Sequence, residues 1–116
     1  MKGFSSSSKP IKKKLTLNMQ QTINKAFNFL QTGKTNEALL LYEKLLEKNC
    51  KDPNFLSNYA VLLRRKGEFE KAIKLLTESI KLYPKRSEAF CNLSLILSNK
   101  GKNDEAINYI KKALYL

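Results

Sequence analysis

The sequence predicts an all-α fold in which helix-turn-helix units repeat and stack into a solenoid. Three segments, GKTNEAL, GEFEKAI and GKNDEAI, share one pattern and recur at a constant step, as the positions of Gly33, Gly67 and Gly101 show. A fixed period of about 20–50 residues is typical of repeat architectures. No stretch alternates with a period of two, so no strand is expected. A stack of such units presents an extended surface rather than an enclosed catalytic pocket.

The composition argues against several classes of function, including catalysis or metal binding that depends on histidine. The chain has 116 residues, a net charge of +12 and no His, so it lacks the commonest general base and metal ligand. Cys50 and Cys91 lie far apart and form no CxxC pair, which predicts reduced thiols in a reducing compartment. No apolar run reaches the roughly 18 residues of a membrane span, and no signal peptide is evident. We therefore expect a cytoplasmic protein without a transmembrane segment.

Residues 1–16 are predicted to form a disordered basic tail. This stretch contains four consecutive serines, a proline and five lysines without any acidic residue. Like charges repel one another, and so few apolar residues cannot form a core.

Residues 17–116 are predicted to form the repeat domain, with units at about 19–52, 53–86 and 87–116. In the first unit, apolar residues recur at helical spacing on two successive helices that Gly33 separates. Pro53 is suited to the first turn of the next helix, and Pro84 ends the second unit. The residues expected on the apolar faces are Ile23, Ala26, Phe27, Leu30, Ala38, Leu41, Tyr42 and Leu45 in the first unit; Leu56, Tyr59, Ala60, Leu63, Ala72, Leu75, Leu76 and Ile80 in the second; and Phe90, Leu93, Ser94, Leu97, Ala106, Tyr109, Ile110 and Ala113 in the third.

This pattern resembles the tetratricopeptide repeat (TPR), a helix-turn-helix unit of about 34 residues. The resemblance extends over about residues 19–116. The second unit matches the large, small, Gly and Pro positions of the family with Leu56, Ala60, Gly67, Ala72 and Pro84. The third unit matches with Phe90, Leu93, Ser94, Leu97, Gly101, Ala106, Ile110 and Ala113. The resemblance implies a right-handed superhelix of three TPR units, with the first helix of each unit lining the inner face.

The first unit departs from the family pattern. Thr22 and Lys25 occupy positions where large apolar residues belong, and Cys50 replaces the proline. A terminal unit has no neighbour on its outer side, so polar residues are expected there.

Asparagine occupies one family position in all three units, at Asn24, Asn58 and Asn92. An amide side chain donates and accepts, so it can bind both backbone groups of an extended peptide. Such a ladder looks like the one on the inner face of the O-linked GlcNAc transferase repeats. The alternative is that these asparagines are ordinary solvated residues.

Other positions on the implied inner face carry charge or apolar side chains. Arg64 and Arg65 suit an acidic side chain or a terminal carboxylate. The carboxylate clamp of chaperone-binding repeats is not expected, because only Asn58 fits it. A further position holds Phe27, Val61 and Leu95 in the three units. These residues form either an apolar stripe along the groove or part of the core.

The third unit reaches Leu116 without the polar helix that usually covers a last repeat. Ile110, Leu114 and Leu116 are therefore expected on an open end. This arrangement indicates a longer protein or self-association through that end, unless it is simply a tolerated helix terminus.

We expect a protein-interaction scaffold that binds an extended segment of a partner protein or peptide on its concave face. No catalytic set, phosphate loop or metal cluster is apparent, so neither enzymatic activity nor a cofactor is expected. The alternative is a substrate-recruiting region of a larger glycosyl-, sulfo- or methyltransferase. Specific nucleic-acid recognition is less favoured, because much of the positive charge lies in the tail or is scattered. Nonspecific, salt-sensitive attraction of residues 9–14 to polyanions or anionic lipid is favoured over specific recognition.

Overall fold

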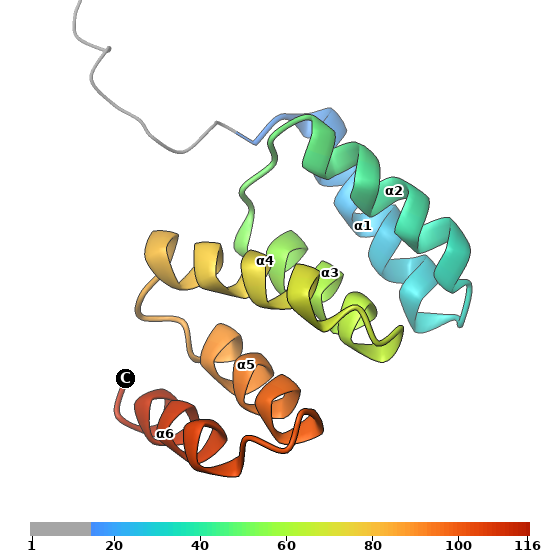
Figure 1. The fold of residues 1–116 in the computed structure, drawn as a ribbon. Coiled ribbons are helices and arrows are strands. Elements are labelled where there is room, and N and C mark those ends of the chain that lie inside the picture. Colours follow the sequence, from blue (N-terminus) through green and yellow to red (C-terminus); the bar gives the residue numbers. More distant parts are fainter. Residues whose placement is uncertain (1–14) are drawn as a thin grey trace, which may run out of the picture.

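The computed structural model describes residues 15–116, and the predictions for residues 1–14 lie outside this range. The described part contains six α-helices and no strand, so the all-α prediction is confirmed. Successive helices pair into three hairpins that follow one another along a stack (Figure 1). The helices are α1 (Leu17–Gln31), α2 (Thr35–Glu47), α3 (Pro53–Arg65), α4 (Phe69–Leu82), α5 (Ser87–Asn99) and α6 (Asn103–Leu114).

The repeated glycines make the turn inside each hairpin. Gly33, Gly67 and Gly101 have φ values of +80°, +79° and +80°, in the left-handed region that side chains disfavour. The helix ends predicted from these glycines are confirmed. Asn49, just after α2, also has a positive φ of 60°, which was not predicted from the sequence. Asparagine tolerates this geometry better than most residues.

Side-chain hydrogen bonds cap the N-termini of α1 and α3, the first helices of the first two units. The Asp52 carboxylate accepts a hydrogen bond from the Phe55 backbone N–H at 3.0 Å, and Pro53 occupies the first turn of α3 as predicted. The Thr16 hydroxyl caps α1 in the same way, by accepting from the Met19 backbone N–H at 3.0 Å. Such caps satisfy backbone donors that have no partner within the helix.

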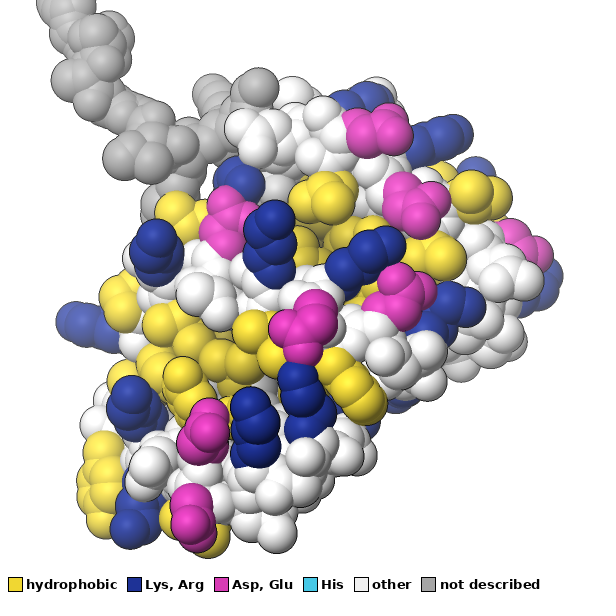
Figure 2. Space-filling view, viewed as in Figure 1, with side chains coloured by type: hydrophobic (Ala, Val, Ile, Leu, Met, Phe, Trp, Pro, Cys, Tyr) yellow, Lys and Arg dark blue, Asp and Glu magenta, His cyan; other side chains and the backbone are white. Residues whose placement is uncertain are grey.

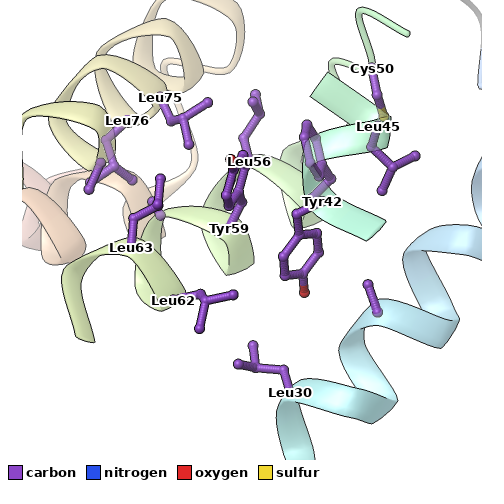
Figure 3. Packing of buried hydrophobic residues seen from close by; sticks show 14 of the residues in the cluster. Leu30, Tyr42, Leu45, Cys50, Leu56, Tyr59, Leu62, Leu63, Leu75 and Leu76 are labelled. Atoms are coloured by element: carbon purple, nitrogen blue, oxygen red, sulfur yellow. The ribbon is translucent and has the colours of Figure 1, made fainter. Parts of the chain in front are cut away.

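The hairpins share one apolar core. In this core, Leu56 and Tyr59 of α3 lie between Tyr42 of α2 and Leu76 of α4 (Figure 3). Every residue that the sequence assigned to an apolar face is buried or half-buried, with two exceptions described below. The repeat spacing thus predicts most of the core.

Three fully buried residues were missed, namely Phe55, Leu62 and Ile96. They lie on α3 and α5, where apolar residues cover a wider arc than a single helix face. The reason is tertiary, because α3 contacts α1, α2, α4 and α5. A helix enclosed on several sides buries more than one stripe of residues.

Two residues predicted on apolar faces are partly exposed instead. Phe27 is 38% exposed and Ile110 is 39% exposed. Phe27 lies at the side of α1, and Ile110 lies at the end of the stack. Ile110, Leu114 and Leu116 are all exposed, as predicted for this end.

The first helices of successive units approach one another more closely than the second helices do. Cα atoms of α3 lie within 8 Å of both α1 and α5, whereas among the described residues no Cα atoms of α2 and α4, or of α4 and α6, come this close. A stack that is tighter on one side curves toward that side. We refer to the side formed by α1, α3 and α5 as the inner face.

Candidate partner-binding face

The three repeated asparagines lie at one position on α1, α3 and α5. Asn24 is exposed, and Asn58 and Asn92 are half-buried. The Asn24 side chain accepts a hydrogen bond from Gln20 Nε2 at 3.2 Å. Within residues 15–116, the side chains of Asn58 and Asn92 form no hydrogen bond, so their donors and acceptors remain accessible to a ligand.

The position shared by Phe27, Val61 and Leu95 is also solvent-accessible in all three units. Phe27 and Leu95 are 38% and 48% exposed, and Val61, in the middle unit, is half-buried. The end units leave this position more open because each has only one neighbour. These side chains offer apolar contact beside the asparagines rather than belonging to the closed core.

Arg64 and Arg65 end α3, where their charge also complements the helix dipole. Arg65 is exposed and Arg64 is half-buried. The Nε atom of Arg64 is buried and has no hydrogen-bond partner among the described residues. A buried donor without an acceptor costs about 1–3 kcal/mol, so this N–H group weakens the fold and is itself out of reach of a ligand.

A polar network that was not predicted from the sequence joins the second and third units. Arg86 Nη2 donates to Glu88 Oε2 at 3.1 Å and to Asn54 Oδ1 at 3.3 Å. Asn54 and Glu88 occupy family positions of the inner face, so this network engages two side chains that would otherwise bind a ligand. Arg86 and Glu88 lie two residues apart, so their ion pair could have been predicted from the sequence. The contact of Arg86 with Asn54 could not, because it depends on how the units stack.

Two further family positions of the inner face are not accessible. Ile23 and Leu30 of the first unit are buried in the core. The family pattern places both on the inner face, whereas their helical spacing predicts an apolar face. The spacing is confirmed, because α1 turns these side chains toward the core that it shares with α2 and α3.

A separate groove of about 560 Å³ lies on the opposite side, between α2 and α4. Its floor is formed by Tyr59, Leu63 and Leu75, with Glu43 of α2 and Lys71 of α4 among its charged rim residues. Figure 2 shows apolar side chains in the gap between α2 and α4, with charges of both signs around them. Burial raises the pKa of Tyr59, and the nearby Glu43 and Glu68 add to this effect.

Some kinds of site have no counterpart in residues 15–116. No group of three or more Cys, Asp or Glu residues there could hold a metal ion. None of the helices in this range has both the length and the hydrophobicity that crossing a bilayer requires. Cys50 is buried and Cys91 half-buried, and both are free thiols as predicted.

Stacked helix hairpins with accessible polar side chains along the inner face define a helical-repeat protein. The family model described as "Anaphase-promoting complex, cyclosome, subunit 3" matches residues 31–113, which is more than half of the chain. The chain therefore belongs to this tetratricopeptide-repeat family, and the predicted family resemblance is confirmed.

Curated relatives match part of this chain. The type IV pilus assembly protein PilF of Pseudomonas aeruginosa is 34% identical over 77 residues, covering 65% of this chain and 31% of that protein. The photosystem I assembly protein Ycf3 of Prochlorococcus marinus strain SARG is 29% identical over 75 residues, covering 53% of this chain and 43% of that protein. The chain thus spans less than half the length of these two relatives.

Solved structures show the same fold at low sequence identity. The translocator chaperone SycD of Yersinia enterocolitica has a TM-score of 0.77 at 22% identity, over 87% of this chain and 77% of that one. The second TPR domain of Spaghetti (RPAP3), bound to the HSP90 peptide SRMEEVD, has a TM-score of 0.76 at 23% identity, over 84% of each chain. MamA has a TM-score of 0.74 at 23% identity, over 83% of this chain and 55% of that one.

Proposed function

We propose that this chain is a protein-interaction scaffold whose inner face holds an extended segment of a partner polypeptide. The observation that carries the proposal is the row of Asn24, Asn58 and Asn92 on the three first helices. Two of these three side chains have no hydrogen-bond partner within residues 15–116. An amide can donate to a peptide C=O and accept from a peptide N–H at the same time. Asparagines at a fixed repeat step therefore suit the backbone of a ligand more than particular side chains.

Arg64 and Arg65 add a preference for acidic segments. A guanidinium can form paired, charge-assisted hydrogen bonds with a carboxylate. Arg65 is exposed and Arg64 is half-buried, so both side chains can approach such a carboxylate. We infer that a Glu or Asp side chain, or a terminal carboxylate, lies near the end of α3 when the peptide is bound.

Phe27, Val61 and Leu95 complete the proposed face. They provide apolar contact on each unit, and the two outer residues are the more accessible. A ligand with apolar residues between acidic ones would use both kinds of contact. The names of several relatives agree with this kind of role, since SycD is a chaperone, PilF and Ycf3 are assembly proteins, and the Spaghetti domain is bound to a peptide.

The test is a binding screen with displayed random decapeptides, followed by titration of the selected peptides. The Asn24→Ala, Asn58→Ala, Asn92→Ala triple variant should bind them at least about tenfold more weakly, since each lost hydrogen bond contributes about 1 kcal/mol. The matched control replaces Asn36, Asn103 and Asn108, which are exposed residues of the second helices, with Ala. Selected peptides should be enriched in Asp and Glu, and Arg64→Gln should remove that enrichment. Equal binding by both triple variants would refute the inner face as the site.

A further inference from the structure

The C-terminal end of the stack exposes a large apolar surface, which we call the end surface. Ile110 and Leu114 of α6 are 39% and 74% exposed, and Leu116, just beyond α6, is 55% exposed. Isolated exposed apolar residues are normal, but a contiguous group marks an interaction surface. The end surface consists of Ile107, Ile110, Leu114 and Leu116.

Each end-surface residue has an equivalent one repeat earlier that is more buried. Leu76, the equivalent of Ile110 in the second unit, is 0% exposed. Ile73, Ile80 and Leu82, the equivalents of the other three, are half-buried. The equivalent residues on α4 are more buried because α5 packs against α4, whereas no described helix packs against α6 from that side. The end surface therefore has the same pattern as the surface that receives α5.

The opposite end of the stack is more polar. Thr22 and Lys25 of α1 stand where α3 has the buried Leu56 and Tyr59. These polar residues suit the outer side of α1 to contact with water. An apolar outer side is therefore not a general property of the ends of this stack.

Charge at the end surface indicates a second feature of its ligand. Lys100, just after α5, donates to Glu70 near the start of α4 at 2.5 Å, so this ion pair links neighbouring units. Asp104 of α6 occupies the position equivalent to Glu70, one repeat later. Asp104 is exposed and has no ion-pair partner among residues 15–116. A helix that binds α6 as α5 binds α4 would place its own Lys or Arg beside Asp104.

We propose that the end surface binds an amphipathic α-helix supplied by a partner protein, in the orientation that α5 has on α4. The helix carries apolar residues at the spacing of Ala89, Phe90, Leu93 and Leu97, and a Lys or Arg follows its C-terminal end. A second copy of this chain is a poorer ligand. Its own α3 and α5 are enclosed, and the outer side of its α1 is polar at Thr22 and Lys25.

The test uses a helix-stapled, fluorescein-labelled synthetic peptide with the sequence of residues 87–102, in which Ser replaces Cys91. Fluorescence anisotropy should show saturable binding to the intact chain. Ile110→Glu should weaken this binding at least about tenfold, because it places a charge in the apolar contact. Leu40→Glu is the matched control, since Leu40 is 61% exposed on α2, away from the end surface. Both variants change exposed residues, and circular dichroism verifies that each retains its helices.

A charge exchange tests the orientation. Asp104→Lys should weaken binding about fivefold, and the peptide with Lys100→Glu should restore it on that variant alone. The Asn24, Asn58 and Asn92 triple variant should bind the peptide like the parent chain, so this result is independent of the proposed inner-face function. Absence of saturable binding, or equal binding by the Ile110→Glu variant, would overturn the proposal. A dimer in sedimentation that Ile110→Glu dissociates would also overturn it, because a second copy would then cover the end surface.

Discussion

Tyr42 and Tyr59 stack with their ring centroids 5.4 Å apart, and this contact joins the first unit to the second. Phe55 lies 5.9 Å from Tyr42 and 5.8 Å from Tyr59, so three rings form one cluster between α2 and α3. Figure 3 shows Tyr42 reaching from α2 toward α3 with its hydroxyl on the side of α1. Aromatic pairs of this kind contribute about 0.5–1.5 kcal/mol beyond the burial of their area.

Tyr42→Phe should not destabilise the protein. The Tyr42 hydroxyl is buried and has no hydrogen-bond partner among the described residues. Its removal keeps the ring contacts and relieves an unsatisfied polar group, so we expect the free energy of unfolding to rise by about 1 kcal/mol. Urea denaturation measures this change. Tyr42→Ala is the contrasting variant and should lose about 3–5 kcal/mol, as large core truncations do.

Alkaline pH should destabilise the protein through the same residue. Burial raises the pKa of Tyr42 to about 12, whereas the pKa of an unfolded tyrosine is about 10. The stability due to neutral Tyr42 is fully present below about pH 10 and is lost as the pH rises toward about 12. Urea denaturation at intervals from pH 8 to pH 11 measures the loss. The loss should be smaller in Tyr42→Phe, which removes only this hydroxyl; identical pH profiles of the two proteins would contradict the assignment.

Gly67→Ala should destabilise the second hairpin through the backbone alone. Gly67 has a φ of +79°, and a Cβ atom placed there would meet nothing within 4 Å. The expected loss is therefore the left-handed strain of an L-residue, about 1–2 kcal/mol, without a steric clash. Thermal and urea unfolding report the change. Lys66→Ala, one residue earlier at a φ of −84°, is the control and should change stability by less than about 0.5 kcal/mol.

Asp52→Ala should remove the cap of α3. The lost hydrogen bond to the Phe55 N–H costs about 1 kcal/mol in typical caps. Asp52→Asn should retain most of the stability, because its side-chain oxygen can still accept. Lys34, which precedes α2 and makes no side-chain cap, provides the control, and Lys34→Ala should be nearly neutral. A loss as large in Asp52→Asn as in Asp52→Ala would show that charge rather than capping matters at this site.

The ion pair between Glu70 and Lys100 should be visible in a titration. The hydrogen bond from Lys100, together with its charge, lowers the pKa of the Glu70 carboxyl. Lys100→Met should raise that pKa toward the ordinary value, which NMR of the side-chain carboxyl measures. Because the pKa is lowered in the folded state, the pair stabilises the fold above the ordinary carboxyl pKa. The contribution disappears as the pH falls through the lowered value.

Much of the candidate inner face could be predicted from the sequence because it repeats. Asn24, Asn58 and Asn92 follow from the constant repeat step, and the structure leaves all three accessible. The burial of Ile23 follows from its helical spacing and not from its family position, since that position does not tell how far α1 turns toward the core. The contact of Arg86 with Asn54 was equally out of reach, because it joins side chains of different units.

The sequence by itself determined the helical class, the three-unit period, the glycine turns and most of the apolar faces. These features depend on local geometry: a left-handed turn needs Gly67, and a helix face needs apolar residues three or four positions apart. Only the tertiary structure decided which apolar residues are covered. Leu76 and Ile110 occupy the same repeat position, yet α5 buries the first and no described helix buries the second. Burial depends on the neighbouring unit, and that information is not contained in the repeat to which a residue belongs.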